Sequence, residues 1–178
     1  MRRRAVPILL ALVGIAPLAA CARPGATAAL PSPGPVFDPA TFFVGRTEGS
    51  GTLARRWHDP EAVSVSGTGE LLVDGTLVLR QRVSRTGHPD RRRLWRLRPT
   101  GVPGEYRGHM SDATDLVTAR VTGNRLTIAY PMRGGFTAVQ QIDLAADGQS
   151  AVNRMTVTLR GLRVATLDEV IRRVGPTR

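Results

Sequence analysis

Residues 70–83 read ELLVDGTLVLRQRV, and in this stretch two runs of strand-forming residues flank the dipeptide Asp74–Gly75. Branched side chains such as valine favour the pleated conformation, and an Asp-Gly pair readily adopts the backbone angles of a tight hairpin turn. The stretch therefore predicts a β-hairpin.

Strand and turn patterns of the same kind recur along the rest of the chain. They include a Gly-Asn turn, an Ala-Asp-Gly turn and a loop rich in proline and glycine. The stretches that carry them are residues 44–57, 91–110, 115–132 and 139–159. About eight strands in a mostly meandering order predict an all-β fold, either an up-and-down barrel or a sandwich.

The end of the chain, residues 166–174, reads TLDEVIRRV and is compatible with two structures. Thr166 and Glu169 have the spacing of a helix capping box. Apolar residues repeat at helical spacing at Leu167, Val170, Ile171 and Val174. We expect a short C-terminal helix, and a strand that closes the sheet is the alternative.

Side-chain alternation divides the hairpin over residues 77–98 into two faces. A turn around residues 87–90 would place Gln81 opposite Trp95. One face is then apolar except for Gln81 and Arg93, whereas the other is rich in arginine and faces solvent. Because an unpaired buried charge is costly, Arg93 needs an acidic partner, supplied by the chain or by a ligand.

The N-terminal residues 1–20 have the organisation of a secretory signal peptide, with three arginines, an apolar run and small residues before the only cysteine, Cys21. The stretch LAAC that ends at Cys21 resembles the lipobox of bacterial lipoproteins, in which the cysteine sulfur receives diacylglycerol. We expect lipidation at Cys21. A secreted protein cleaved after Ala20 is the alternative, and a catalytic thiol is disfavoured because the following residues offer no core to hold a histidine.

These features divide the chain into a signal peptide (residues 1–20), a lipidated cysteine with a Pro/Ala-rich tether (21–35) and a β-domain (36–178). We expect a monomer in the cell envelope, facing the periplasm and held in the membrane by acyl chains on Cys21. Because no aspartate follows the cysteine, we favour the outer membrane over the inner membrane.

The chain is strongly basic, with a formal net charge of +11, and all 25 basic residues are arginine. The positive charge alone would be compatible with binding to nucleic acid, but a protein in the cell envelope is separated from nucleic acid. The absence of lysine indicates a coding bias. We therefore expect no nucleic-acid partner and a basic surface near anionic lipid headgroups.

Several motifs together resemble an uncharacterised family of Gram-negative envelope lipoproteins that carry a domain of unknown function. They lie within residues 37–166, and FFVGRTEGSGTL (42–53) and VTGNRLTIAYPM (121–132) are two of them. The resemblance implies a lipocalin-like β-barrel and a lipid-related role in the envelope. The positions that match the family pattern are Phe43, Gly45, Gly49, Gly51, Leu77, Leu79, Gln81, Val83, Arg93, Trp95, Gly123, Asn124 and Tyr130.

The chain departs from this family pattern at two positions, where Gln81 replaces a glutamate and Val83 replaces a phenylalanine. If the glutamate neutralises the arginine of the Arg-x-Trp motif, Arg93 has lost that partner here. A carboxylate or phosphate of a ligand could then pair with Arg93. The alternative, which we favour, is that Asp112 is the partner of Arg93.

No catalytic constellation, metal-ligand spacing or cofactor-binding loop occurs in the sequence, and the three histidines are isolated. We therefore expect no cofactor and favour a protein that binds or shuttles a hydrophobic, acyl-chain ligand in an apolar cup. The expected ligand-binding residues are Gln81, Arg93, Trp95 and Tyr130, with Arg93 or Tyr130 orienting a polar head. The alternatives are a scaffolding lipoprotein with a packed barrel, or an accessory protein of envelope lipid modification.

Overall fold

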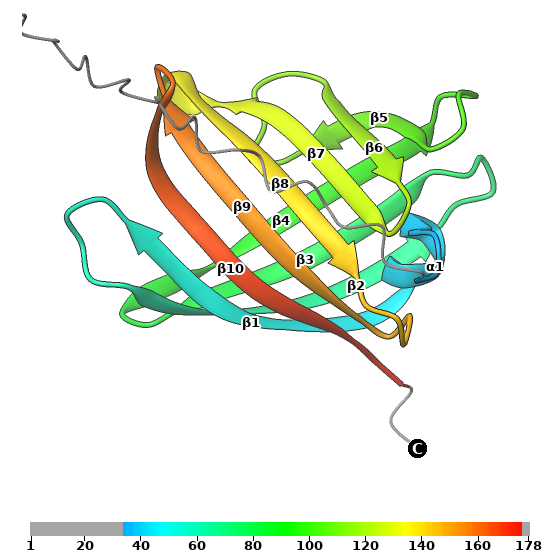
Figure 1. Cartoon of the computed structure of the whole chain (residues 1–178), viewed down its shortest axis with the longest axis horizontal. Helices are drawn as coiled ribbons and strands as arrows, with labels where there is room; N and C mark the ends of the chain where they lie inside the picture. Colours follow the sequence, from blue (N-terminus) through cyan, green and yellow to red (C-terminus); the bar gives the residue numbers. More distant parts are fainter. Residues whose placement is uncertain (1–33, 176–178) are drawn as a thin grey trace, which may run out of the picture. The chain divides into compact units, whose positions relative to one another are not determined.

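Ten antiparallel strands close into a barrel in the computed structural model, which describes residues 34–175 (Figure 1). Each strand pairs with its neighbours in the chain, and the first strand pairs with the last. The strands are β1 (Gly45–Arg55), β2 (Glu61–Leu71), β3 (Leu77–Arg85), β4 (His88–Pro99), β5 (Glu105–Met110), β6 (Val117–Thr122), β7 (Arg125–Met132), β8 (Phe136–Leu144), β9 (Ser150–Leu159) and β10 (Leu162–Val174). The helical elements are α1 (Pro39–Phe43) and the 3₁₀ turn η1 (Arg133–Gly135).

The predicted all-β fold is confirmed, and it is a lipocalin-like barrel rather than a sandwich. The hairpin predicted over residues 70–83 is formed by β2 and β3. Gly75 in its turn has a φ of +77°, a left-handed conformation that glycine adopts without steric cost. The barrel has ten strands where the sequence indicated about eight.

The expectation of a short C-terminal helix is wrong, because residues 166–174 belong to β10. Leu167, Glu169 and Ile171 point inward and are at most 6% exposed, whereas Val170 points outward. Leu167, Glu169 and Ile171 form a two-residue alternation typical of a strand. Because Glu169 is charged, the inward face does not appear apolar in the sequence, and the strand pattern is hidden. Pairing with β1 on one side and β9 on the other overrides the weak local helix signal.

Two glycines of β1 allow the barrel to close against β10. A Cβ atom on Gly49 would collide with the carboxyl group of Glu169. A Cβ atom on Gly51 would lie 2.7 Å from the Cα atom of Glu169, so the backbones of β1 and β10 would have to separate. The close approach of the two strands explains why these positions need glycine.

The β3–β4 hairpin preserves the predicted faces but shifts the predicted register by two residues. Gln81 lies opposite Arg93 rather than Trp95, because the tip of the hairpin is at residues 86–87 and precedes the expected turn. A shift by two residues keeps every side chain on its face of the sheet. Gln81, Arg93 and Trp95 therefore still point into the barrel.

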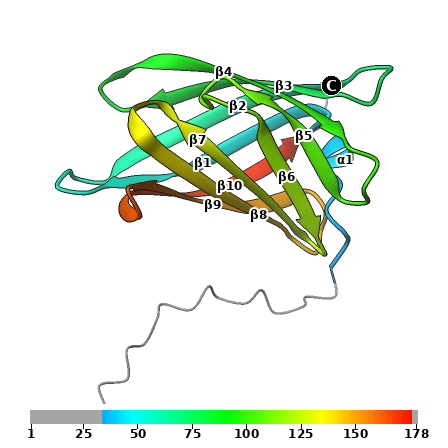
Figure 2. The ribbon, with the colours of Figure 1, turned by 90° about the horizontal axis from the view of Figure 1, so that it is seen from above.

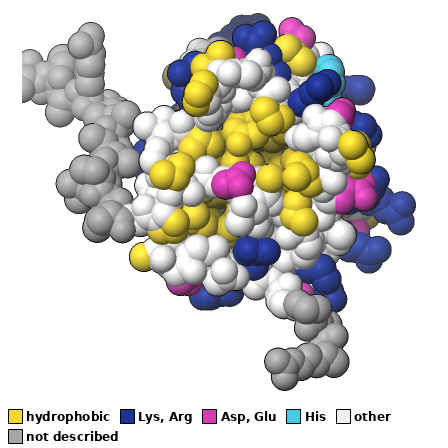
Figure 3. Space-filling model, turned by 90° about the vertical axis from the view of Figure 1, so that its right-hand side faces the viewer, with side chains coloured by type: hydrophobic (Ala, Val, Ile, Leu, Met, Phe, Trp, Pro, Cys, Tyr) yellow, Lys and Arg dark blue, Asp and Glu magenta, His cyan; other side chains and the backbone are white. Residues whose placement is uncertain are grey.

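Helix α1 covers one end of the barrel, at the right in Figures 1 and 2. Phe37, Phe42 and Phe43 are almost fully buried, and the ring of Phe43 lies 5.9 Å from that of Trp95, centroid to centroid. Figure 3 views this end and shows hydrophobic side chains gathered over it. The aromatic cluster and the helix close this end of the barrel.

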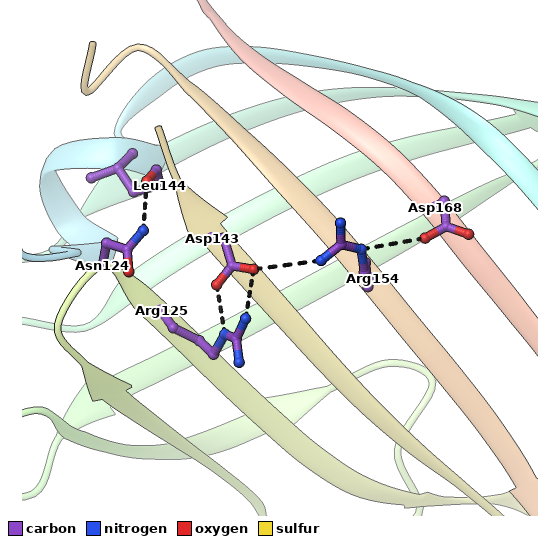
Figure 4. Close-up of polar contacts among 6 residues, drawn as sticks. All are labelled: Asn124, Arg125, Asp143, Leu144, Arg154 and Asp168. Atoms are coloured by element: carbon purple, nitrogen blue, oxygen red, sulfur yellow. Dashed lines mark hydrogen bonds and ion pairs between the residues drawn. The ribbon is translucent and has the colours of Figure 1, made fainter. Parts of the chain in front are cut away.

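The Gly-Asn turn between β7 and β6 has a structural role (Figure 4). Gly123 has a φ of +57°, and the side-chain amide of Asn124 donates a hydrogen bond of 3.0 Å to the carbonyl oxygen of Leu144. The main-chain amide of Phe37 in turn donates to the carbonyl oxygen of Gly123. The turn therefore ties β8 and the segment before α1 to the closed end.

The predicted signal peptide (residues 1–20), Cys21 and nearly all of the predicted tether (21–35) lie outside the described residues. Within residues 34–175, no helix is long and apolar enough to cross a bilayer.

Candidate ligand site at the open end of the barrel

A cavity of about 150 Å³ lies at the end of the barrel opposite α1. Its walls include Arg85 and Arg91 beside the tip of the β3–β4 hairpin, and Met132 at the end of β7. Its apolar lining consists of Leu53, Val63, Val65, Val83, Met132, Met155 and Leu167. The barrel thus has one end closed by α1 and one end with an apolar recess.

An ion pair borders the recess. The Nε atom of Arg93 donates to the Oδ2 atom of Asp112 at 2.6 Å, and the two side chains are only 17% and 8% exposed. The favoured sequence interpretation, that Asp112 is the partner of Arg93, is confirmed. Arg91 reaches the other carboxylate oxygen of Asp112 at 3.8 Å and is mostly exposed, so its charge is free to meet a second anion.

Charged side chains at the mouth of the recess are organised by Glu61 at the start of β2. Arg55 donates to this carboxylate, and Arg85 and His88 lie 3.4 Å and 3.5 Å from its Oε2 atom. Partial desolvation opposes its ionisation, but the hydrogen bond from Arg55 and the nearby cations lower the pKa of Glu61. The recess itself is lined by three arginines and one aspartate, so its lining is cationic.

Glu169 brings a second buried carboxyl group into the barrel. It is 6% exposed and accepts a hydrogen bond of 2.7 Å from the side-chain amide of Asn153. Burial raises the pKa of Glu169, and this effect is only partly opposed by the Asn153 hydrogen bond and the charge of Arg93. Glu169 was not among the predicted site residues, because its spacing from Thr166 resembles a helix capping box.

Of the four residues predicted to bind a ligand, Arg93 alone borders the recess. Trp95 and Tyr130 are 2% and 1% exposed, and the Tyr130 hydroxyl contacts the sulfur of Met155 at 3.9 Å. Burial raises the pKa of Tyr130. The Oε1 atom of Gln81 and the Nε1 atom of Trp95 are buried without a hydrogen-bond partner among residues 34–175. The role of these residues in binding stays a prediction.

Two residues that border the recess, Arg85 and Arg91, were not predicted. They flank the tip of the hairpin that carries Arg93, and extending the same side-chain alternation to residues 85 and 91 would have identified them. No group of three metal-binding side chains occurs in the described part of the chain.

Replacing Glu169 by glutamine is expected to stabilise the fold at neutral pH. Since folding raises the pKa of Glu169, the contribution of this residue to stability is fully present below the ordinary value of 4.5 and is lost as the pH rises through the raised value. Glutamine has no proton to lose and can still accept from Asn153. Urea unfolding should show equal stabilities below pH 4.5 and a more stable variant near neutrality. Glu48→Gln on the exposed face of β1 is the control, and a wild-type pH dependence in Glu169→Gln would contradict the prediction.

The fold and the recess define the class of protein: a lipocalin-like antiparallel barrel, closed at one end by a helix, with a small apolar recess and a cationic lining at the other. Residues 15–173 match the family described as "Protein of unknown function (DUF3833)", and the chain belongs to that family.

Solved structures with similar barrels are distant in sequence. The S-type phycobiliprotein lyase CPES from Guillardia theta superposes with a TM-score of 0.60 at 8% identity, covering 75% of this chain and 89% of the lyase. A protein of unknown function from the DUF3598 family of Nostoc punctiforme gives 0.58 at 14% identity, covering 79% of this chain and 50% of that protein. These similarities support the fold. No curated protein matches this chain.

Proposed function

We propose that this protein is a lipoprotein of the Gram-negative envelope, anchored through acyl chains on Cys21, whose barrel binds a hydrophobic ligand that carries an anionic head. The observation that carries the binding proposal is the recess at the open end, where apolar walls lie beside Arg85, Arg91 and Arg93. Such a combination suits the end of an acyl chain and a carboxylate or phosphate.

The position of each arginine assigns its part in binding. Arg93 is held by Asp112, and Arg85 lies beside Glu61. Arg91 is 67% exposed and has only a long contact of 3.8 Å to Asp112. We therefore assign the main contact with the anionic head of the ligand to Arg91, and a secondary contribution to the more buried Arg93.

The size of the recess limits what enters it. An apolar cavity of about 150 Å³ holds a molecule about as large as benzene, and most pockets for larger ligands exceed about 300 Å³. The ligand would therefore insert only its anionic head and the first few carbons of its chain. The same observation favours the second candidate function, a scaffolding lipoprotein whose interior is filled by its own side chains.

Binding of dodecanoate and dodecanol to the purified protein tests the proposal, with native mass spectrometry to detect co-purified lipid. We expect both probes to bind in the recess and the carboxylate to bind more tightly. Arg91→Gln should weaken dodecanoate binding by roughly fivefold to tenfold and leave dodecanol binding unchanged. Equal loss for both probes would contradict the role of Arg91.

A variant that fills the recess provides the steric test. Val83→Trp should weaken binding of both probes by at least about tenfold, because the larger side chain occupies the space of the ligand. Val139→Trp on the outer face of β8, where the valine is 38% exposed, is the matched control and should bind as wild type does. If wild-type protein binds neither probe and carries no lipid, the scaffolding function is favoured.

Membrane anchoring is tested separately by Cys21→Ser. Without the thiol no diacylglycerol can be attached, so the protein should leave the membrane fraction after a high-salt wash, which removes electrostatic attachment. Ala22→Ser keeps the cysteine and should stay in the membrane. An unchanged membrane fraction for Cys21→Ser would contradict lipidation.

A further inference from the structure

The outer face of β3 and β4 is an arginine surface with few carboxylates. The outward side chains of β3 and β4 and their neighbours on β5 include Arg80, Arg82, Arg92, Arg96, Arg98 and Arg107. Arg82 lies directly opposite Arg92 across the two strands. Like charges at directly opposed positions destabilise a sheet, so this pairing has a cost to folding.

Acidic side chains neutralise this surface only in part. Four of the six arginines have a carboxylate nearby: Glu70 is 2.6 Å from Arg80, Asp90 and Glu105 are 3.6 Å from Arg82 and Arg107, respectively, and Asp74 is 4.0 Å from Arg98. Among residues 34–175, neither Arg92 nor Arg96 forms an ion pair within 4.0 Å. The surface therefore keeps a local excess of positive charge.

The opposite wall of the barrel is built differently (Figure 4). There Arg125 on β7 makes two hydrogen bonds to Asp143 on β8, of 2.6 Å and 2.9 Å. Arg154 on β9 lies between Asp143 and Asp168, at 4.0 Å and 3.8 Å. Arg125 and Arg154 on β7 and β9 are thus matched by carboxylates, whereas Arg92 and Arg96 on β4 have no such partner among the described residues.

An open groove of about 500 Å³ lies in the arginine surface. Its lining includes four arginines, three residues with hydroxyl groups and one amide: Arg80, Arg82, Arg92, Arg93, Ser66, Thr68, Ser111 and Gln81. Guanidinium groups bind phosphate oxygens through two parallel hydrogen bonds, and hydroxyl groups add further donors. Leu94 also borders the groove and is 38% exposed, so an apolar side chain stands among the cations.

We propose that the outer face of β2, β3 and β4, centred on Arg80, Arg82 and Arg92, binds the phosphate headgroups of an anionic bilayer directly. An anionic surface offsets the repulsion between Arg82 and Arg92, and several headgroups meet the strand face at once. Leu94 contacts the acyl boundary between them. This contact requires neither lipidation of Cys21 nor a ligand in the recess.

The test measures binding of the chain without its predicted signal peptide, residues 21–178 carrying Cys21→Ser, to vesicles of phosphatidylcholine, with and without phosphatidylglycerol. We expect binding that requires phosphatidylglycerol and weakens as salt is added. Arg80→Gln/Arg82→Gln/Arg92→Gln should reduce the affinity by roughly fivefold per arginine, about 100-fold in total. Arg46→Gln/Arg154→Gln/Arg172→Gln, on the wall formed by β1, β9 and β10, removes the same charge and should lose less than about tenfold.

The outcomes separate this proposal from its alternatives. Equal losses in the two triple variants, or binding that is independent of phosphatidylglycerol, would overturn it. If inorganic phosphate binds the groove but anionic vesicles do not bind the protein, the groove is a small-anion site and the membrane contact is wrong. Circular dichroism and dodecanoate binding of the same variants show that the fold and the recess are intact, so a failure here is distinct from a failure of the proposed ligand site.

Discussion

Replacing Trp95 by alanine is expected to destabilise the barrel by about 3–5 kcal/mol, the cost of removing a large aromatic side chain from a packed core. Trp95 is 2% exposed and packs against Phe43 of α1. Its loss leaves a cavity between the barrel wall and the cluster that closes the end. Urea unfolding followed by far-UV circular dichroism measures the change, since the remaining tryptophan, Trp57, is exposed and reports poorly on the core.

Trp95→Phe is the matched variant, because it keeps an aromatic ring beside Phe43. It also removes the indole N–H, which is buried without a partner among the described residues. We expect this variant to lose less than about half of the stability that Trp95→Ala loses. If Trp95→Ala were as stable as wild type and lost only dodecanoate binding, Trp95 would be a ligand contact rather than a core residue.

The second large effect is expected from Asp112→Ala, which leaves the guanidinium of Arg93 without its carboxylate. Breaking a mostly buried ion pair by removing one partner costs about 3–5 kcal/mol of folding stability. Because the Arg93 side chain is 17% exposed and water can partly solvate it, we expect a loss near the lower limit of that range. Urea unfolding again provides the measurement. Asp115→Ala in the same loop removes a charge that is exposed and is the control.

The double variant Arg93→Met/Asp112→Ala distinguishes a structural pair from a ligand-binding arginine. Removing both charges leaves no unpaired cation, so the double variant should be more stable than Asp112→Ala alone. It should also retain dodecanoate binding if Arg91 carries the head contact. A double variant less stable than Asp112→Ala would show that Arg93 has other essential contacts inside the barrel.

The two stability predictions concern different layers of the same interior. Trp95 belongs to the aromatic layer next to α1, and the Arg93–Asp112 pair borders the recess at the open end. Val83 lines the recess at that open end.

Part of the candidate site follows from local chemistry. Side-chain alternation places Arg93 on an inward face, and a buried charge requires a partner. The choice of Asp112 as that partner rests on the family resemblance of its stretch. Glu169 could not be predicted in the same way. Its place inside the barrel depends on β10 pairing with β1 and β9, which are distant in the sequence.

The sequence by itself determined the all-β class, the main hairpins and the inward and outward faces of β3 and β4, because turn chemistry and side-chain alternation act over a few residues. Only the tertiary structure decided that the C-terminal segment is a strand, that the sheet closes into ten strands and that the recess is about 150 Å³. These features depend on register between distant strands and on how side chains fill a shared interior. No local pattern encodes either of them, because each side chain in that interior is constrained by partners from several strands.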